Sequence, residues 1–242
     1  MAIQILINGA KGKMGATTVL AIGNEADMSL VAATDREDDL ALALKTHQPD
    51  VVIDFTSADA SWQNLQTIIG HGAKPVIGSS GLTLEQIDQA KALCKDKKLG
   101  GIIAPNFSIG AILMMRYAQD CAKYLSDVEI IETHHPAKLD APSGTAMKTA
   151  EMIADNRKTK TANDSRELIK GALGAKHCDI PIHSLRLPGT IANQSVIFGG
   201  PGQTLTITHN TLDRMSFMPG VFLACRHVMA STELTYGLAN II

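Results

Sequence analysis

The sequence predicts an α/β protein, with a doubly wound parallel sheet followed by a smaller α+β domain. In residues 1–107, short apolar segments rich in Val and Ile alternate with segments of helical periodicity. These apolar segments end in glycine or small polar residues, which is typical of the edge where such sheets bind ligands. From Ile180 the pattern changes to the alternation of an antiparallel or mixed sheet. We therefore expect a first domain of residues 1–107, completed by 214–242, and a second domain of residues 108–213.

The bulk composition excludes several classes of protein. The chain has 242 residues with 45% hydrophobic content, enough for one large domain or two smaller ones with cores of their own. Its formal net charge of -2, without a long basic run, predicts no nucleic-acid partner. The four cysteines are scattered and form no C-x-x-C pair, so we expect reduced, mostly buried thiols and no metal site. Without a basic leader or a membrane-length apolar run, we expect a cytoplasmic protein with no membrane partner.

The segment after the first predicted strand, residues 3–7, predicts a Rossmann-like dinucleotide-binding turn. The turn consists of Gly9, Ala10, Lys11, Gly12, Lys13, Met14 and Gly15, and a predicted helix continues from Ala16. Glycines permit the tight turn and let the backbone approach a pyrophosphate, which then lies on the helix N-terminus. The spacing G-x-x-G-x-x-G is a variant of the usual fingerprint, so a glycine turn without a ligand is an alternative.

The second predicted strand, residues 28–33, strengthens the dinucleotide interpretation. Asp35 follows this strand about 20 residues after Gly15, where a Rossmann unit places the acid that binds the ribose hydroxyls of adenosine. An Asp alone favours NADH, because a 2′-phosphate would meet a like charge. The adjacent Arg36 can bind that phosphate and admit NADPH, although a solvated loop charge is an equal alternative. We expect both cofactors to be accepted.

Three further strands are predicted before residue 105, and their ends are expected at the same edge of the sheet. Their tips are Phe55 and Thr56, then Gly78, Ser79 and Ser80, then Ala104, Pro105, Asn106 and Phe107. Phe55 and Phe107 fit a ligand contact or the core. Helices are predicted at residues 61–70, where Trp62 fits the core, from a Thr83 cap to about Leu93, and from Ile109 to about Tyr124.

Ionisable residues are densest at 132–146, between a predicted strand at 128–133 and a predicted helix at 146–154. This stretch holds His134, His135, Lys138 and a Pro-Ser-Gly-Thr turn. Ser143, or Asp140 slightly earlier, can start the helix, because small polar side chains accept hydrogen bonds from first-turn amides. Ionisable side chains would then face free backbone N–H groups, which suits an anionic substrate that must receive a proton. A polar surface loop is the alternative, which this density makes the weaker one.

The rest of the second domain is predicted from simpler patterns. Residues 155–170 are polar and charged, and we expect a loop with a short helix. Strands are predicted at 182–187, 194–198 and 204–208, and a helix from Met215 to Met229 that returns to the first domain.

Taken together, these motifs resemble the dihydrodipicolinate reductase family over essentially the full length. The matching segments are residues 9–15, 35–36, 54–56, 78–81, 106–110 and, most specifically, 132–145. The resemblance implies reduction of 4-hydroxy-tetrahydrodipicolinate by NADH or NADPH in lysine and diaminopimelate synthesis. It also implies a homotetramer in which the second-domain sheets associate.

The resemblance also implies residue roles. His134 corresponds to the family's catalytic histidine and Lys138 to its proton donor. His135 corresponds to a substrate-carboxylate contact, and Ser143, Gly144 and Thr145 form the substrate-binding helix start. The matched nucleotide-binding positions are Gly9 to Met14, Asp35, Arg36, Gly78 to Ser80 and Ala104 to Phe107.

The chain departs from the family pattern in three places. Ser79-Ser80 replaces the usual Thr-Thr, Asn193-Gln194 replaces a common Glu-His pair, and the polar loop before Ile180 is shortened.

Two rival functions explain part of the sequence. An aspartate or homoserine type of dehydrogenase would share the first domain but gives no reason for the histidine stretch. A dinucleotide sensor or scaffold would also need only the first domain, and the fold alone never proves function.

Overall fold

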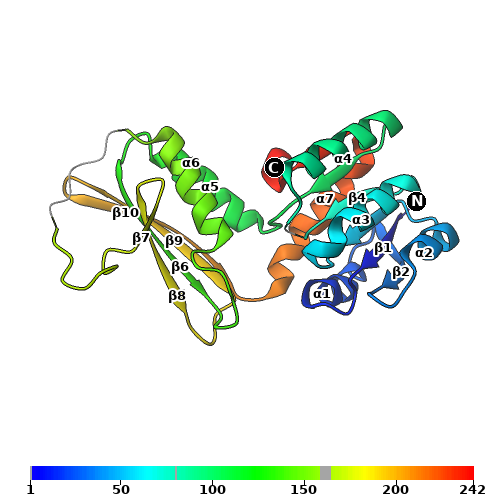
Figure 1. Cartoon of the computed structure of the whole chain (residues 1–242), viewed down its shortest axis with the longest axis horizontal. Helices are drawn as coiled ribbons and strands as arrows, with labels where there is room; N and C mark the ends of the chain where they lie inside the picture. Colours follow the sequence, from blue (N-terminus) through cyan, green and yellow to red (C-terminus); the bar gives the residue numbers. More distant parts are fainter. Residues whose placement is uncertain (1, 80, 159–164) are drawn as a thin grey trace. The chain divides into compact units, whose positions relative to one another are not determined.

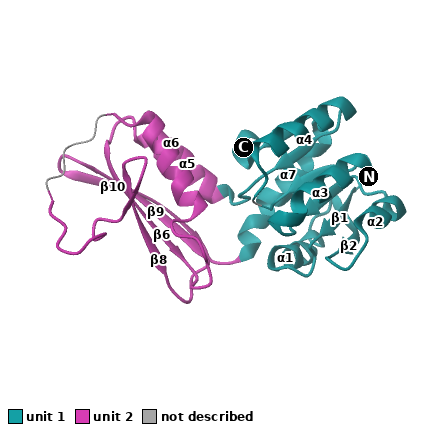
Figure 2. Ribbon diagram, viewed as in Figure 1, with its two compact units in different colours: residues 1–109, 214–242 teal, residues 110–213 magenta. Residues whose placement is uncertain are grey.

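The computed structural model describes residues 2–79, 81–158 and 165–242, and the chain divides into two compact units (Figure 1). Unit 1 consists of Met1–Ile109 and Arg214–Ile242, and unit 2 of Gly110–Asp213, coloured separately in Figure 2. In the described ranges, no helix is long and apolar enough to cross a membrane.

In its described residues, unit 1 is built on a six-stranded parallel sheet with the order β11-β5-β4-β3-β1-β2. The strands are β1 (Ile3–Asn8), β2 (Met28–Thr34), β3 (Val51–Asp54), β4 (Lys74–Ile77), β5 (Gly101–Ile103) and β11 (Leu234–Tyr236). The central strands are buried on both faces, as near-continuous apolar segments of a parallel sheet should be. The predicted doubly wound sheet is confirmed. The edge strand β11 was not predicted, because three residues carry too little periodicity.

Helices cover both faces of this sheet. They are α1 (Lys13–Ile22), α2 (Leu40–His47), α3 (Ala58–Gly70), α4 (Leu84–Lys97) and α7 (Met218–Ala230). Apolar residues of α2, α3 and α4, such as Leu44, Leu65 and Ile87, share a core with alternate strand residues such as Leu6 and Val52. The α7 helix contacts β3, β4 and β5. The Thr83 cap is confirmed as a full capping box, although α4 continues beyond Leu93.

The described part of unit 2 holds a mixed five-stranded sheet with the order β10-β9-β6-β8-β7. The strands are β6 (Asp127–His134), β7 (Ala175–His177), β8 (Ile180–Arg186), β9 (Ala192–Gly200) and β10 (Gln203–Thr211). Central β6 pairs parallel with β8 and antiparallel with β9. Helices α5 (Ile109–Cys121) and α6 (Gly144–Asn156) lie along one face (Figure 1), and Ile130, Val196 and Phe198 are buried. The predicted α+β domain is confirmed.

Three expectations need correction, two for helices of unit 2 and one for the cysteines of both units. The helix expected to reach Tyr124 ends at Cys121, and residues 157–158 and 165–170 form no helix; residues 159–164 lie outside the described residues. All four cysteines are free thiols, and Cys94 and Cys225 are buried, but Cys178 is exposed. Cys178 and Asp179 have φ of 51° and 59° and form the two-residue connection of the β7–β8 hairpin. Asp is common in such turns, but Cys is not and no glycine marks the position, so this hairpin was missed.

Candidate nucleotide and substrate sites

The β1–α1 turn of unit 1 is built by close backbone approach. Gly9 has a φ of +82°, and a Cβ there would lie 2.8 Å from the carbonyl oxygen of Phe55. A Cβ on Gly15 would lie 2.1 Å from the carbonyl oxygen of Gly9. Gly12 is the N-cap of α1, and no side chain caps that end within the described residues. The first-turn amides therefore remain available to an anion such as a pyrophosphate.

Asp35 is fixed beside this turn by backbone amides. Its carboxylate accepts hydrogen bonds from the backbone N–H of Lys11 and of Arg36, both at 2.8 Å. These two bonds, that of Arg36 first, hold the pKa of Asp35 below its ordinary value. An ionised carboxylate only accepts, so Asp35 is suited to the hydroxyls of a ribose.

A cavity of about 430 Å³ brings part of the predicted nucleotide set together. Its lining includes the predicted residues Gly9, Gly12, Asp35, Arg36 and Phe55. The lining residues do not include the predicted Ala10, Lys11, Lys13, Met14, Gly78, Ser79, Ala104, Pro105, Asn106 and Phe107. The glycine turn and Asp35 therefore flank a common hollow, which suits part of a nucleotide.

Several of the other predicted residues have structural contacts instead. A Cβ on Gly78 would lie 2.2 Å from the ring of Phe55, which meets Phe107 edge to face at 5.8 Å between centroids. The Ser79 hydroxyl is buried and lies 2.5 Å from the Ser61 hydroxyl. The predicted residue Ser80 lies outside the described residues.

The turn after β5 is stabilised by a hydrogen bond between one of its own side chains and its backbone. The Asn106 side chain accepts a hydrogen bond from the backbone N–H of Ser108 at 2.8 Å. Ala104 is fully buried and Pro105 is exposed.

A buried polar network that the sequence analysis missed ties the strand ends beneath the cavity. The Asp54 carboxylate is fully buried and accepts hydrogen bonds from the side chains of Asn8 and Asn64, both at 2.9 Å. Thr34 in turn donates to Asn8 at 2.9 Å. The ends of β1, β2 and β3 are thereby joined. A polar residue that closes an otherwise apolar strand was the available signal.

The candidate substrate site is in unit 2, where β6 ends in a buried carboxylate and a histidine. Glu132 is fully buried, and its Oε2 lies 2.5 Å from Nδ1 of His134. Burial alone would raise the pKa of Glu132, but hydrogen bonds from Arg186, Ser184 and His134 outweigh it and hold the pKa below its ordinary value. Burial lowers the pKa of His134, against the raising effect of Glu132.

Arg186 completes this group from β8. Its two terminal nitrogens donate to the two oxygens of Glu132 at 2.9 and 3.0 Å. The Oε1 atom of Glu132 also accepts the backbone N–H of Ser143 at 3.2 Å. The sequence analysis missed Glu132 and Arg186 as site residues. The signal for Glu132 was a charge in the inward-facing position of a strand whose neighbours Val128 and Ile130 face the core.

The remaining predicted substrate residues follow in the loop and at the start of α6. The Lys138 ammonium pairs with Asp140 at 2.7 Å. His135 is partly buried, and its backbone carbonyl accepts a hydrogen bond from the Lys138 backbone N–H at 3.1 Å. Ser143, rather than Asp140, caps α6, because its hydroxyl accepts the Ala146 N–H at 3.2 Å. The amides of Gly144 and Thr145 belong to the first turn and have no acceptor within the helix.

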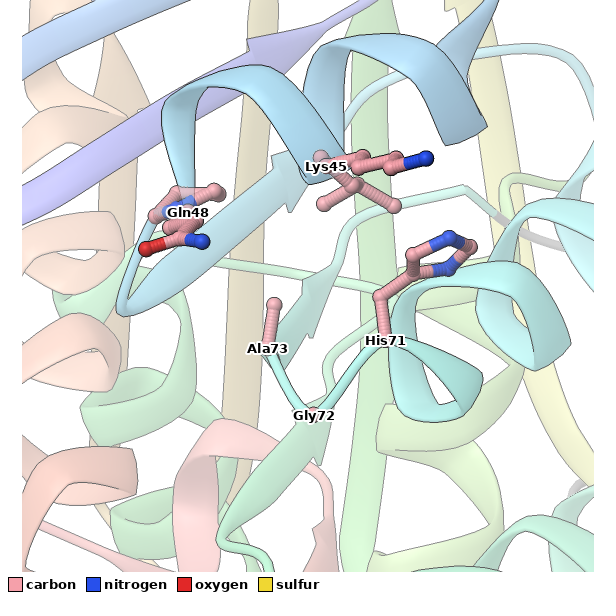
Figure 3. Close-up of a pocket in the computed structure, with 7 residues that line it drawn as sticks. Lys45, Gln48, His71, Gly72 and Ala73 are labelled. Atoms are coloured by element: carbon pink, nitrogen blue, oxygen red, sulfur yellow. The ribbon is translucent and has the colours of Figure 1, made fainter.

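A second cavity of about 340 Å³ lies at the opposite edge of the unit 1 sheet (Figure 3). It is lined by Leu44, Lys45, Gln48, Pro49, His71, Gly72 and Ala73. Pro49 and Ala73 precede β3 and β4, so this hollow is at the amino ends of the strands, and none of its residues was predicted as a site. Among the described residues, no cluster of three or more His, Cys, Asp or Glu side chains is arranged to hold a metal ion.

Comparisons with known proteins identify the family. The family model described as dihydrodipicolinate reductase, N-terminus, matches residues 3–107, and the one described as its C-terminus matches residues 110–242. The 4-hydroxy-tetrahydrodipicolinate reductase of Coxiella burnetii (strain RSA 493 / Nine Mile phase I) is 52% identical over 242 residues and covers 100% of both chains. That of Legionella pneumophila (strain Lens) is 52% identical over 243 residues, again with full coverage.

Solved structures agree with this result. The dipicolinate-bound dihydrodipicolinate reductase from Paenisporosarcina sp. TG-14 has a TM-score of 0.91 at 41% identity and covers 100% of each chain. A probable dehydrogenase from Thermotoga maritima has a TM-score of 0.66 at 11% identity, covering 99% of this chain and 92% of its own, and supports the fold alone. Unit 1 is a Rossmann-type nucleotide-binding domain, and the chain belongs to the dihydrodipicolinate reductase family.

Proposed function

We propose that this chain is an NAD(P)H-dependent reductase that converts 4-hydroxy-tetrahydrodipicolinate to tetrahydrodipicolinate in lysine and diaminopimelate synthesis. The observation that carries the proposal is the arrangement at the end of β6, where a buried carboxylate holds His134 close to the start of α6. The names of the relatives, 4-hydroxy-tetrahydrodipicolinate reductases, support this substrate. The structure of the Paenisporosarcina relative, described as dipicolinate-bound, supports a dicarboxylate ligand.

Unit 2 has residues that suit two tasks, binding of the substrate carboxylates and donation of the proton. The first-turn amides of Gly144 and Thr145 and the side chain of His135 suit the carboxylates of the substrate, because a helix N-terminus attracts anions. His134 and Lys138 are the proton sources, as an imidazole of lowered pKa and an ammonium. Overall, the ring loses its 4-hydroxyl and one ring hydrogen as water, and it gains a hydride and a proton.

The glycine turn from Gly9 to Met14 and Asp35 hold the dinucleotide in this proposal. When bound, the reduced nicotinamide supplies the hydride, and the protein supplies position and charge. Asp35 binds the ribose hydroxyls of NADH, and Arg36 lines the same cavity and meets the 2′-phosphate of NADPH. We therefore propose that both cofactors are used.

The cellular location and the oligomeric assembly of the chain are part of the same proposal. We propose a cytoplasmic homotetramer in which the unit 2 sheets associate, as the resemblance to the family implies. Light scattering on the purified chain measures the assembly directly, and a monomer at micromolar concentration would contradict it.

The test of the function is oxidation of NADH and of NADPH with freshly generated 4-hydroxy-tetrahydrodipicolinate. Rapid turnover with either cofactor supports the proposal. The ratio of the two rates measures the preference between NADH and NADPH that Asp35 and Arg36 together produce. Tight cofactor binding without turnover would contradict it and favour an aspartate or homoserine type of dehydrogenase, or a sensor. Aspartate semialdehyde and homoserine serve as the alternative substrates in the same assay.

A further inference from the structure

The carboxylate of Glu132 accepts hydrogen bonds from several elements, including one from Ser184. Its Oε2 accepts hydrogen bonds from Nδ1 of His134 and from one nitrogen of Arg186. Its Oε1 accepts hydrogen bonds from the other nitrogen of Arg186 and from the backbone N–H of Ser143. An ionised carboxylate can only accept, so Nδ1 of His134 must carry the proton in this bond. The neutral ring then presents Nε2 as its unprotonated nitrogen, the atom from which the imidazolium form donates its proton. One tautomer and one ring orientation are thereby selected.

Arg186 is itself fixed on the side away from Glu132. It donates to the backbone carbonyl of Asp140 at 2.6 Å and to that of Leu185 at 2.7 Å. The guanidinium therefore connects β8, β6 and the loop that leads to α6. Because a planar guanidinium binds a carboxylate in a bidentate manner, it fixes the orientation of Glu132 as well as its position.

We propose that Glu132 and Arg186 are positioning residues for His134: Glu132 holds the ring with Nε2 toward the substrate, and Arg186 holds Glu132 and balances its charge. This inference rests on the proposed function for its catalytic meaning. By joining His134 to the Ser143 amide, the pair also fixes the proton source relative to the start of α6.

The balance of charge has a consequence with a definite sign. A buried carboxylate stabilises the imidazolium, and a buried guanidinium opposes that effect. Other charged groups near His134 and Glu132 are Lys138 and Asp140 in the following loop. The charged and titratable groups on neighbouring elements are Arg186 on β8 and, beyond the uncharged Gln194 of β9, His209 on β10. Loss of Glu132 or of Arg186 should therefore shift the titration of His134 in opposite directions.

The experiment compares the pH profiles of kcat for Glu132→Gln and Arg186→Gln with that of the native chain. If protonated His134 is the acid, Glu132→Gln moves the basic limb to lower pH and Arg186→Gln moves it to higher pH. Each also lowers kcat, by on the order of 100-fold if the ring moves by about 1 Å. Glu129→Gln is the matched control, since Glu129 bonds His183 at 2.8 Å across the same two strands, and its profile should match the native one.

A second measurement keeps the test independent of turnover and of folding defects. Nitrogen NMR of the histidines in the native chain should show His134 as the Nδ1–H tautomer, and Arg186→Lys, which keeps the charge, should restore most of the native pH limb. An Nε2–H tautomer would overturn the inference, as would unshifted pH limbs with reduced thermal stability in both Gln variants. If the native chain fails to reduce the substrate, the proposed function fails, and the NMR result still decides the inference.

Discussion

The two candidate sites of the chain differ in the groups that form them. In unit 1, the nucleotide site consists mainly of backbone: glycines in close approach, the first-turn amides of α1, and Asp35 held by two backbone N–H groups. In unit 2, the site depends on a buried ionic group in which the side chains of Glu132, Arg186 and His134 bond one another. The first is local in the chain, whereas Glu132 and Arg186 lie 54 residues apart.

This difference predicts two kinds of sensitivity. A backbone cradle fails when a side chain is added, because a Cβ has no space between fixed main-chain atoms. A buried ionic group fails when one partner is removed, because the charge that remains is uncompensated. Substitutions in unit 1 should therefore act on cofactor affinity, and substitutions in unit 2 on turnover.

The largest effect is expected for His134→Gln, which removes the proposed proton source. We expect kcat to fall by roughly 10²–10⁴-fold, the usual contribution of a positioned acid or base. The affinity for the reduced dinucleotide, measured by fluorescence titration, should barely change, because the residues proposed to bind it are in unit 1. His183→Gln is the control, since His183 also bonds a glutamate. Native turnover in His134→Gln would remove His134 from its assigned role.

The counterpart in unit 1 is Gly15→Ala. The added methyl group would lie 2.1 Å from the carbonyl oxygen of Gly9 and 2.8 Å from Cα of Ala10, so the turn must move. We expect the free energy of unfolding to fall by about 1–3 kcal/mol and the affinities for NADH and NADPH to fall together. Gly70→Ala is a matched control, because nothing lies within 4 Å of its Cβ position. Unchanged cofactor affinity in Gly15→Ala would show that the turn does not act as a cradle.

The local nature of the first site explains how the sequence predicted a strand, a glycine turn, a helix and Asp35 in this order. The order of strand, glycine turn, helix and Asp35 is readable because each part follows the last along the chain. The starting point of α1 was placed too late, at Ala16, because Gly15 was assigned to the turn. In fact Gly15 is a helical residue whose missing side chain lets α1 approach Gly9.

The second site was predicted only in its local part. His134, Lys138 and the Ser143 cap lie within one stretch, and the cap was found from its residue type. Arg186 was treated as part of an ordinary strand, since no local pattern shows which carboxylate an arginine will meet. The parallel register of β6 and β8, which places Arg186 beside His134, is set by tertiary pairing and not by the spacing of residues.

A smaller effect, confined to one cofactor, is expected for Arg36→Ala. A charge-assisted hydrogen bond is worth about 1.5–3 kcal/mol, so the affinity for NADPH should fall by roughly 10–100-fold. NADH has no 2′-phosphate and should be nearly unaffected. Lys91→Ala, on the exposed surface of α4, controls for the loss of a positive charge. Equal losses for NADH and NADPH would contradict the 2′-phosphate role.

The smallest effects are expected at two of the helix caps, and they separate stability from function. Thr83 caps α4 and Ser143 caps α6, and each hydroxyl accepts a backbone N–H at 3.2 Å. Thr83→Ala and Ser143→Ala should each lower the free energy of unfolding by about 1 kcal/mol. Only Ser143→Ala should also raise KM for the dicarboxylate substrate, because the start of α6 is where the substrate carboxylate is proposed to bind. If chemical denaturation and steady-state kinetics show the same stability loss and native KM values in both variants, the α6 terminus is a structural end like that of α4, and the carboxylate must be bound elsewhere.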